Sequence, residues 1–209
     1  MSKHFETLQV HAGRYNDPST GSCATPIHQT VSYEFKSAQH AVDLFNLKAE
    51  GHIYTRLSNP TTDVLEKRIA ALEGGIAAVA VASGQSAHFL TFNNLAGVGD
   101  NILSTPSLYG GSYNQLKVNF AKLGVGVKFA KKDTESFHQL IDEKTKAIFT
   151  ETMGNSDFYI PDFEQLAEIA HKHNIPLIVD NTFGGAGYLF KPKDYGANII
   201  THAATKWIG

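Results

Sequence analysis

The chain has 209 residues, 42% of them hydrophobic and 18% charged, a composition typical of a soluble globular protein with one sizeable domain. A formal net charge of −2 and a pI near 6.5 exclude an electrostatic case for nucleic acid or an anionic membrane as a partner. Cys23 alone cannot form an internal disulfide framework, and without an apolar membrane-spanning run or the apolar core of a secretion signal we expect a cytoplasmic protein.

The first part of the chain has weak periodicity with scattered Gly, Ser and Thr, and residues 1–50 are predicted to form an N-terminal arm with a short helix near 38–47. A second helix is predicted from Asn59-Pro60 to Gly74-Gly75, because Asn is a good N-cap, Pro fits the first helical turn and Gly ends helices. Its expected apolar face consists of Leu65, Ile69 and Leu72.

The apolar run Ile76–Ala82 predicts a fully buried strand, followed by a turn over 83–86 and an apolar helix. Further strands are predicted at 101–104, 125–130, 146–151, 176–180 and 198–202. Helices are predicted at 111–123, at 134–142 and after Pro161-Asp162, the last with Phe163, Leu166, Ala167 and Ala170 on one face.

This alternation of apolar strands with helices predicts an α/β domain over residues 51–209, with three α/β/α layers around a mostly parallel sheet. Ligands of such domains bind at the carboxyl ends of the strands. The segments that follow strands are therefore the candidates for a site, namely 83–85, 104–111, 151–155, 180–182 and 202–206.

Asp180 ends the apolar strand predicted at 176–180. A carboxylate at the mouth of a buried strand must pair with a cation or accept hydrogen bonds. Two interpretations are open for Asp180. It caps a helix or forms an ordinary ion pair, or it pairs with the pyridinium nitrogen of pyridoxal phosphate (PLP), which needs such a partner to act as an electron sink.

Lys206 follows the last predicted strand. A lone lysine is usually a solvated surface charge, but the neighbouring Trp207 and Ile208 predict that Lys206 is partly buried. Burial lowers the pKa of an amine and makes it a competent nucleophile or Schiff-base former. The adjacent Thr205 offers a hydroxyl to a phosphate.

Two further segments favour a cofactor site, although each has an ordinary structural interpretation. The turn before the helix at Gly84 presents backbone N–H groups that suit an anion, but such turns are common in α/β proteins. Tyr109, before Gly110-Gly111, places an aromatic ring at a strand end or simply covers the core. Dinucleotide, zinc-protease, paired-cysteine and nucleophile-elbow motifs are absent, and His171 and His173 lie two apart on a helix, so no metal site is expected.

The order of these candidates along the chain is that of fold-type I PLP enzymes: phosphate turn, tyrosine, aspartate, lysine. The chain resembles the Cys/Met-metabolism family of these enzymes over nearly its whole length, and within it the O-acetylhomoserine sulfhydrylases. The matching segments are 10–13, 26–30, 53–56, 58–61, 72–75, 83–85, 108–111, 151–155, 180–183 and 204–209.

The resemblance implies that Lys206 carries PLP as a Schiff base and moves the substrate proton, that Asp180 pairs with the pyridine nitrogen, and that Tyr109 stacks on the ring. Tyr109 and Lys206 are the implied catalytic residues. The other implied cofactor-binding residues are Gly84, Gln85 and Thr205 at the phosphate, Asn155 near the phenolic oxygen, Thr182, and Tyr54 and Arg56 reaching the phosphate of a neighbouring subunit. That last role implies an obligate homotetramer built from dimers that share active sites, and Arg suits phosphate oxygens.

The chain departs from the family at three places. Ala203 stands where the family has a serine that donates to the phosphate, so one hydrogen bond is expected to be missing. Ser156 replaces a proline, which predicts a less rigid loop. The chain stops at Gly209 directly after Trp207 and Ile208, which suggests a cut, and the family's C-terminal domain with its carboxylate-binding arginine is missing from this incomplete major domain.

The implied activity is the PLP-dependent conversion of O-acetylhomoserine and sulfide to homocysteine and acetate, a step of methionine biosynthesis. Cystathionine γ-synthase and methionine γ-lyase share the cofactor machinery and remain alternatives. From another class, a non-catalytic PLP-binding fragment or pseudo-enzyme is also open. A nucleotide-binding regulatory domain has little support, because no dinucleotide or Walker pattern is present.

Overall fold

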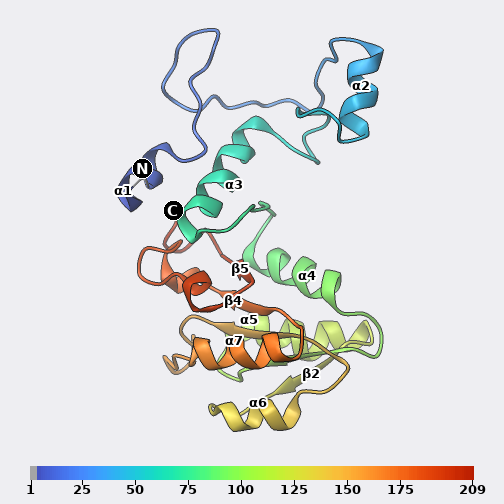
Figure 1. The fold of residues 1–209 in the computed structure, drawn as a ribbon, viewed down its shortest axis with the longest axis vertical. Helices are drawn as coiled ribbons and strands as arrows, with labels where there is room; N and C mark the ends of the chain where they lie inside the picture. The colour runs from blue at the N-terminus through green and yellow to red at the C-terminus, as the bar shows by residue number, and fades with distance from the viewer. Residues whose placement is uncertain (1–3) are drawn as a thin grey trace. The chain divides into compact units, whose positions relative to one another are not determined.

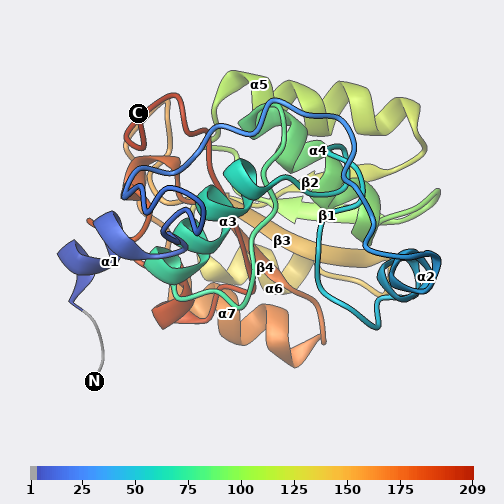
Figure 2. The same ribbon diagram turned by 90° about the horizontal axis from the view of Figure 1, so that it is seen from above.

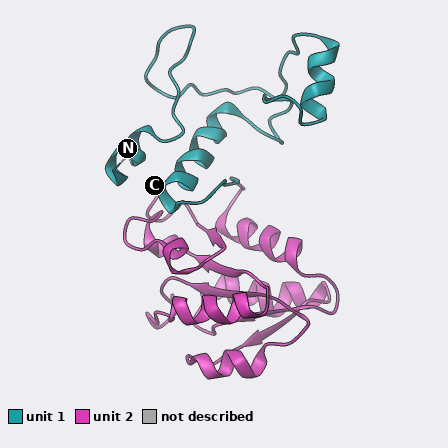
Figure 3. Cartoon of the chain, viewed as in Figure 1, with its two compact units in different colours: residues 1–80 teal, residues 81–209 magenta. Residues whose placement is uncertain are grey.

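The computed structural model describes residues 4–209, and the chain divides into two compact units, residues 1–80 and 81–209 (Figure 3). The first unit holds helix α3 (Pro60–Glu73) as well as helix α1 (Phe5–His11), and the two helices pack together. Arg68 of α3 fixes this packing by donating from Nε to the carbonyl oxygen of Ala12 at 3.0 Å. The two units are divided after residue 80, whereas the domain boundary was predicted after residue 50. That domain boundary stays a prediction.

The helices of the first unit follow the sequence signals. Helix α2 (Ala38–Phe45) confirms the short helix predicted near 38–47. Helix α3 begins as predicted, since the Asn59 side chain accepts from the N–H of Thr61 at 2.9 Å, and it ends at Gly74 with φ 71°. The predicted apolar face is only partly right: Leu72 is buried, whereas Leu65 is 42% exposed.

The buried strand predicted at Ile76–Ala82 is wrong. The segment is irregular, and Ile76 and Val79 are 104% and 81% exposed. A strand requires a hydrogen-bonding neighbour, and within residues 4–209 no strand pairs with this segment. The side chain of Glu66 anchors the segment, since its Oε1 accepts from the N–H of Ala80 at 2.8 Å.

The second unit is built on one sheet in which all the strands are parallel, in the order β2-β1-β3-β4-β5. Its strands are β1 (Asn101–Ser104), β2 (Gly126–Phe129), β3 (Thr145–Glu151), β4 (Leu177–Asp180) and β5 (Ile199–Thr201). Each lies where the apolar runs predicted it, to within two residues. The register of β3 and β4 sets Glu151 beside Asp180 at the carboxyl edge of the sheet.

Helices cover both faces of this sheet, as Figures 1 and 2 show. One face carries α4 (Gly84–Leu95), α5 (Gly110–Asn114) and the π-helical turn η1 (Gln115–Phe120), and the other carries α6 (Thr134–Leu140) and α7 (Phe163–Lys172). Two short 3₁₀ helices, η2 (Thr182–Gly184) and η3 (Pro192–Tyr195), lie between β4 and β5. The predicted three-layer α/β/α architecture is confirmed. None of the helices in the described part of the chain is long and apolar enough to cross a membrane.

The packing of the core explains why the strands appear in the sequence as apolar runs. Successive strand residues point to opposite faces, and both faces are covered, so both sets are buried. Phe149 and Ile178 pack towards α4, with the Phe149 and Phe92 rings edge to face at 5.0 Å. Ile148 and Leu177 pack on the opposite face, where α7 contributes its predicted apolar stripe. The sheet is therefore a rigid base for the loops at its carboxyl edge.

Candidate active site at the carboxyl edge of the sheet

Asp180 is held from two sides at the end of β4. Its Oδ1 accepts from the backbone N–H of Thr182 at 3.0 Å and from the Thr182 hydroxyl at 2.5 Å. Its Oδ2 lies 3.1 Å from Nε2 of His88 on α4. Burial alone raises the pKa of Asp180, but the hydrogen bond and charge of His88, together with the two Thr182 donors, outweigh burial and hold this pKa below its ordinary value.

These contacts leave Asp180 with unused capacity. A carboxylate oxygen accepts about two hydrogen bonds. The two Thr182 donors fill Oδ1, whereas His88 occupies only one of the two positions on Oδ2. The side chain retains 12% exposure, so Asp180 presents an ionised oxygen that can accept one more donor.

Thr182 and Gly84 bring the segment after β5 into the same place. The hydroxyl of Thr182 accepts from the N–H of Ala203 at 2.8 Å, which ties the end of β4 to the chain before Lys206. A Cβ placed on Gly84 would lie 2.8 Å from the Cβ of Ala203. This close approach requires a glycine at 84, so the predicted phosphate turn and the lysine segment are adjacent.

The N-terminus of α4 is arranged to receive an anion. Ser83 caps the helix, its side chain accepting from the N–H of Ser86 at 3.1 Å. The N–H of Ala87 reaches the carbonyl of Ser83. The N–H groups of Gly84 and Gln85 find no acceptor among the described residues, which is the arrangement that binds phosphate at helix ends.

The side chain of Gln85 is committed elsewhere. Its Nε2 donates to Oγ of Ser112 on α5 at 3.1 Å, and its backbone carbonyl accepts from Nε2 of Gln115 at 3.0 Å. Only the backbone N–H of Gln85 is free for the predicted phosphate contact, as the resemblance implied.

Tyr109 lies on the loop after β1 and its side chain is 51% exposed. Its backbone N–H donates to Oε1 of Glu151 at 2.7 Å, which anchors the loop to the end of β3. The ring folds back over Gly111, where a Cβ would lie 2.5 Å from the Cε1 of Tyr109. An exposed aromatic face on an anchored backbone can stack on a planar ligand.

Glu151 is the second carboxylate of this edge and is 4% exposed. The pKa of Glu151 is raised to about 7, because burial and the neighbouring charge of Asp180 together outweigh the hydrogen bonds from the N–H groups of Tyr109 and Asn155, which lower it. Through these two N–H groups Glu151 joins the loop that carries Tyr109 to the loop that carries Asn155.

Asn155 is exposed on the loop after β3. Although Ser156 follows it in place of proline, hydrogen bonds fix this loop. Asp157 accepts from the hydroxyl of Ser107 at 2.8 Å and pairs with Lys132. The predicted loss of rigidity at Ser156 is untested, but the loop has anchors beyond its backbone.

The predicted partial burial of Lys206 is wrong, because both Lys206 and Thr205 are exposed and Trp207 is 68% exposed. The segment 203–209 forms turns, with backbone hydrogen bonds from Lys206 to Ala203 at 3.2 Å and from Gly209 to Ala204 at 3.1 Å. These turns direct the apolar side chain of Trp207 outward, so it does not cover the amine. The Schiff-base role predicted for Lys206 therefore rests on its place in the chain and not on burial.

Tyr54 and Arg56 belong to the first unit, so their place relative to the site is a prediction only. Both are exposed, and the Arg56 guanidinium carbon lies 5.4 Å from the centroid of the Tyr54 ring. The backbone of Tyr54 forms an antiparallel bridge with Ser32. An exposed Arg–Tyr pair has the chemistry to receive a phosphate.

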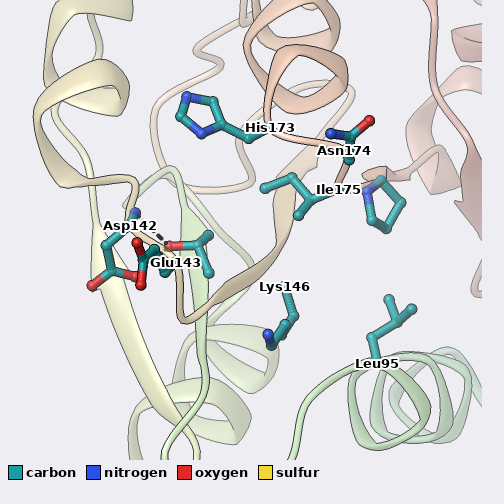
Figure 4. Close-up of a pocket in the computed structure, with 9 residues that line it drawn as sticks. Leu95, Asp142, Glu143, Lys146, His173, Asn174 and Ile175 are labelled. Atoms are coloured by element: carbon teal, nitrogen blue, oxygen red, sulfur yellow. Dashed lines mark hydrogen bonds between the residues drawn. The ribbon is translucent and has the colours of Figure 1, made fainter.

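A hollow at the opposite, amino-terminal edge of the sheet has little to offer chemistry. It is lined by Leu95, residues before and at the start of β3, and the loop before β4 (Figure 4). Two of its charged groups are already paired, Asp142 with Lys128 at 2.6 Å and Lys146 with Asp100 at 3.5 Å. The candidate site therefore stays at the carboxyl edge.

Sequence reasoning missed two residues of this edge. Glu151 ends a strand beside Asp180, and the argument used for Asp180 applies to it equally. His88 lies four residues after Gly84, on the same face of α4 as the predicted phosphate turn, and the available signal was a histidine four residues before Phe92, on the face of the helix that is buried.

The assembled residues fit PLP. The close packing of Gly84 on Ala203 and the two free N–H groups at the start of α4 suit the phosphate. Asp180 keeps one acceptor position for a protonated ring nitrogen, and the Tyr109 ring is exposed. An ionised carboxylate, an aromatic face and an anion site are the groups that this cofactor needs.

Comparison with known proteins also points to a PLP-binding protein. The family model described as "Cys/Met metabolism PLP-dependent enzyme" matches residues 6–209. The chain is 52% identical to homocysteine/cysteine synthase of Saccharomyces cerevisiae, covering 100% of this chain and 48% of that protein. It is 54% identical to O-acetyl-L-homoserine sulfhydrylase 1 of Thermus thermophilus, covering 98% of this chain and 49% of the relative.

A solved structure from Campylobacter jejuni agrees in fold. It is described as an O-acetylhomoserine (thiol)-lyase with N'-pyridoxyl-lysine-5'-monophosphate, and it superposes with a TM-score of 0.94 at 38% identity over 99% of this chain and 50% of its own. The chain thus spans about half the length of the curated relatives it matches.

Proposed function

Because this chain belongs to the Cys/Met-metabolism family of PLP-dependent enzymes, we propose that the full-length protein is an O-acetylhomoserine sulfhydrylase of methionine biosynthesis. The observation that carries this choice is the 52–54% identity, over essentially the whole chain, to proteins named for homocysteine synthesis or O-acetylhomoserine sulfhydrylation. The residues at the carboxyl edge of the sheet supply the matching chemistry.

When bound, PLP supplies an electron sink for the negative charge that develops on the substrate next to its amino group. Asp180 keeps that sink effective by holding a proton on the ring nitrogen through the open position of Oδ2. Gly84, Gln85 and Thr205 hold the phosphate, and Tyr109 covers the ring face. Asn155 and Thr182 complete the contacts, with Thr182 also orienting the Asp180 carboxylate.

The protein groups then direct a γ-replacement. Nζ of Lys206 takes the proton from the substrate Cα and returns it to Cα once sulfide has added. The bond between Cγ and the acetoxy oxygen breaks and acetate leaves, and sulfide forms the new C–S bond at Cγ to give homocysteine. No external oxidant or reductant is required, because one nucleophile replaces another.

The proposed assembly is a homotetramer built from dimers that share active sites. The exposed Tyr54 and Arg56 support this proposal, since an Arg with a neighbouring phenol suits the phosphate of another subunit. The cytoplasmic location also stays a prediction.

The test supplies full-length protein with PLP, O-acetylhomoserine and sulfide, and measures homocysteine and acetate. Equal amounts of the two products, lost in Lys206→Ala, are expected. If homocysteine is not formed while methionine is cleaved, the lyase alternative holds instead. PLP binding without turnover of any of these substrates would indicate a non-catalytic protein.

A further inference from the structure

His88 is a buried polar residue with no role in the implied cofactor set. It lies on α4 and is 1% exposed. Its ring is wedged between aromatic neighbours, edge to face on Phe149 at 5.1 Å and tilted on Phe92 at 6.0 Å. A histidine in such an apolar setting must satisfy both ring nitrogens with specific partners.

Both ring nitrogens of His88 have partners. Nδ1 lies 3.3 Å from Oγ of Ser112 on α5. Nε2 lies 3.1 Å from Oδ2 of Asp180 and 3.0 Å from Oγ1 of Thr201 on β5. The ring therefore bridges the helix layer to the carboxylate at the end of β4.

The hydrogen-bond directions assign the His88 tautomer. Gln85 donates from Nε2 to Oγ of Ser112 at 3.1 Å, so this hydroxyl already accepts and its own proton is free to go to Nδ1 of His88. Because the ionised Asp180 carboxylate only accepts, the ring proton is on Nε2, facing Oδ2 of Asp180, and Nδ1 accepts from Ser112. The chain Gln85, Ser112, His88, Asp180 donates in one direction from the phosphate turn to the carboxylate.

We propose that His88 is a positioning residue that donates its Nε2 proton to Asp180, keeping this carboxylate ionised and oriented to hold the proton on the ring nitrogen of PLP. This inference rests on the proposed function, because it concerns how the same site binds its cofactor. It also links the phosphate turn to the ring-nitrogen partner. Glu151 on β3 is a second titratable group beside Asp180.

The test measures the dissociation constant for PLP in the full-length protein carrying His88→Gln or His88→Leu. Gln retains a donor and is expected to keep affinity within a few-fold, whereas Leu removes it. Hydrogen bonds to charged groups are worth enough that the Leu variant should bind about tenfold to a hundredfold more weakly. Equal weakening in both variants would overturn the proposal.

A double-mutant cycle separates positioning from general packing. If His88 acts through Asp180, then His88→Leu added to Asp180→Asn should weaken PLP binding by much less than it does alone. Full additivity of the two effects would contradict the proposal. Ser112→Ala, which removes the donor to Nδ1 without altering the core aromatics, is expected to weaken binding in the same direction but less.

Thr201→Val is the matched control, since Thr201 also contacts Nε2 of His88 but lies outside the chain of donors. Removing its hydroxyl leaves the proton to Asp180 alone, so affinity should stay the same or improve. Weakening as large as that of His88→Leu would show that Thr201, and not Asp180, is the functional partner.

The nitrogen signals of His88 in PLP-free protein distinguish failure of this inference from failure of the proposed function. A proton on Nε2 and a bare Nδ1 support the assigned donor chain even if the protein makes no homocysteine. A proton on Nδ1 with a bare Nε2 would overturn it even if the enzyme is active.

Discussion

Glu151→Gln should alter the pH dependence of stability in a predictable way. Glu151 is 4% exposed beside Asp180, and its pKa is raised from 4.5 to about 7, first by burial and then by the Asp180 charge. The glutamine keeps a carbonyl oxygen that can accept from the N–H of Tyr109 but cannot ionise. Comparing the two proteins therefore isolates the ionisation of one buried carboxyl group.

The sign follows from which state holds the proton. Between the ordinary pKa of 4.5 and the folded-state pKa of about 7, the unfolded chain loses the proton of Glu151 while the folded chain retains it. The free energy of unfolding then falls as pH rises, by about 1.4 kcal/mol per unit. Over this window the loss amounts to about 3 kcal/mol, complete above pH 7 and absent below 4.5.

The assay is denaturant unfolding of full-length, PLP-free wild-type and Glu151→Gln proteins between pH 5 and pH 8, at one protein concentration. The wild type should lose about 2.5 kcal/mol relative to the variant across this range, because part of the total loss has already occurred at pH 5. Glu143→Gln, at an exposed glutamate, is the control and should follow the wild type. A constant difference between wild type and Glu151→Gln from pH 5 to pH 8 would refute the reasoning.

Three further predictions follow from the packing around the site. Gly84→Ala places a Cβ 2.8 Å from that of Ala203 and should weaken PLP binding by about tenfold. Adding Ala203→Gly should restore the affinity, and Gly97→Ala, where the nearest atom is 3.8 Å away, should have no effect. If the double variant does not recover, the steric explanation is wrong. Ala203→Ser should tighten PLP binding by about tenfold if it restores a hydrogen bond to the phosphate, and unchanged affinity in an absorbance titration would count against this contact. Phe149→Ala removes a fully buried ring shared by Phe92 and His88 and should cost about 3–5 kcal/mol in denaturant unfolding, whereas a loss below 1 kcal/mol would show that the core collapses around the gap.

The sequence predicted the sheet well because its strands are buried on both faces. Their central residues, such as 147–149 and 177–179, are therefore apolar without a break, and the turns between the strands carry strong helix caps such as Asp162, which accepts from the N–H of Gln165. Asp180 could be predicted as a site residue for the same reason, since it ends a buried parallel strand, whereas Gly84 follows an irregular segment and could be predicted only from the helix that begins there.

The predictions that failed concern burial or contacts that depend on residues far away in the sequence, which a local pattern does not show. Ile76–Ala82 has strand composition, yet without a neighbouring strand within residues 4–209 it stays irregular and exposed. Lys206 is exposed because the turns of 203–209 direct Trp207 away from it. His88 was missed because its function depends on contacts with Ser112 and Asp180, which lie 24 and 92 residues away in sequence.

The most direct test of the central claim is reduction of the PLP-loaded, full-length protein with borohydride, followed by mass analysis of its peptides. The account predicts loss of the imine absorbance band and one pyridoxyl group, on Lys206. A pyridoxyl group on any other lysine, or none despite saturating PLP, would contradict it.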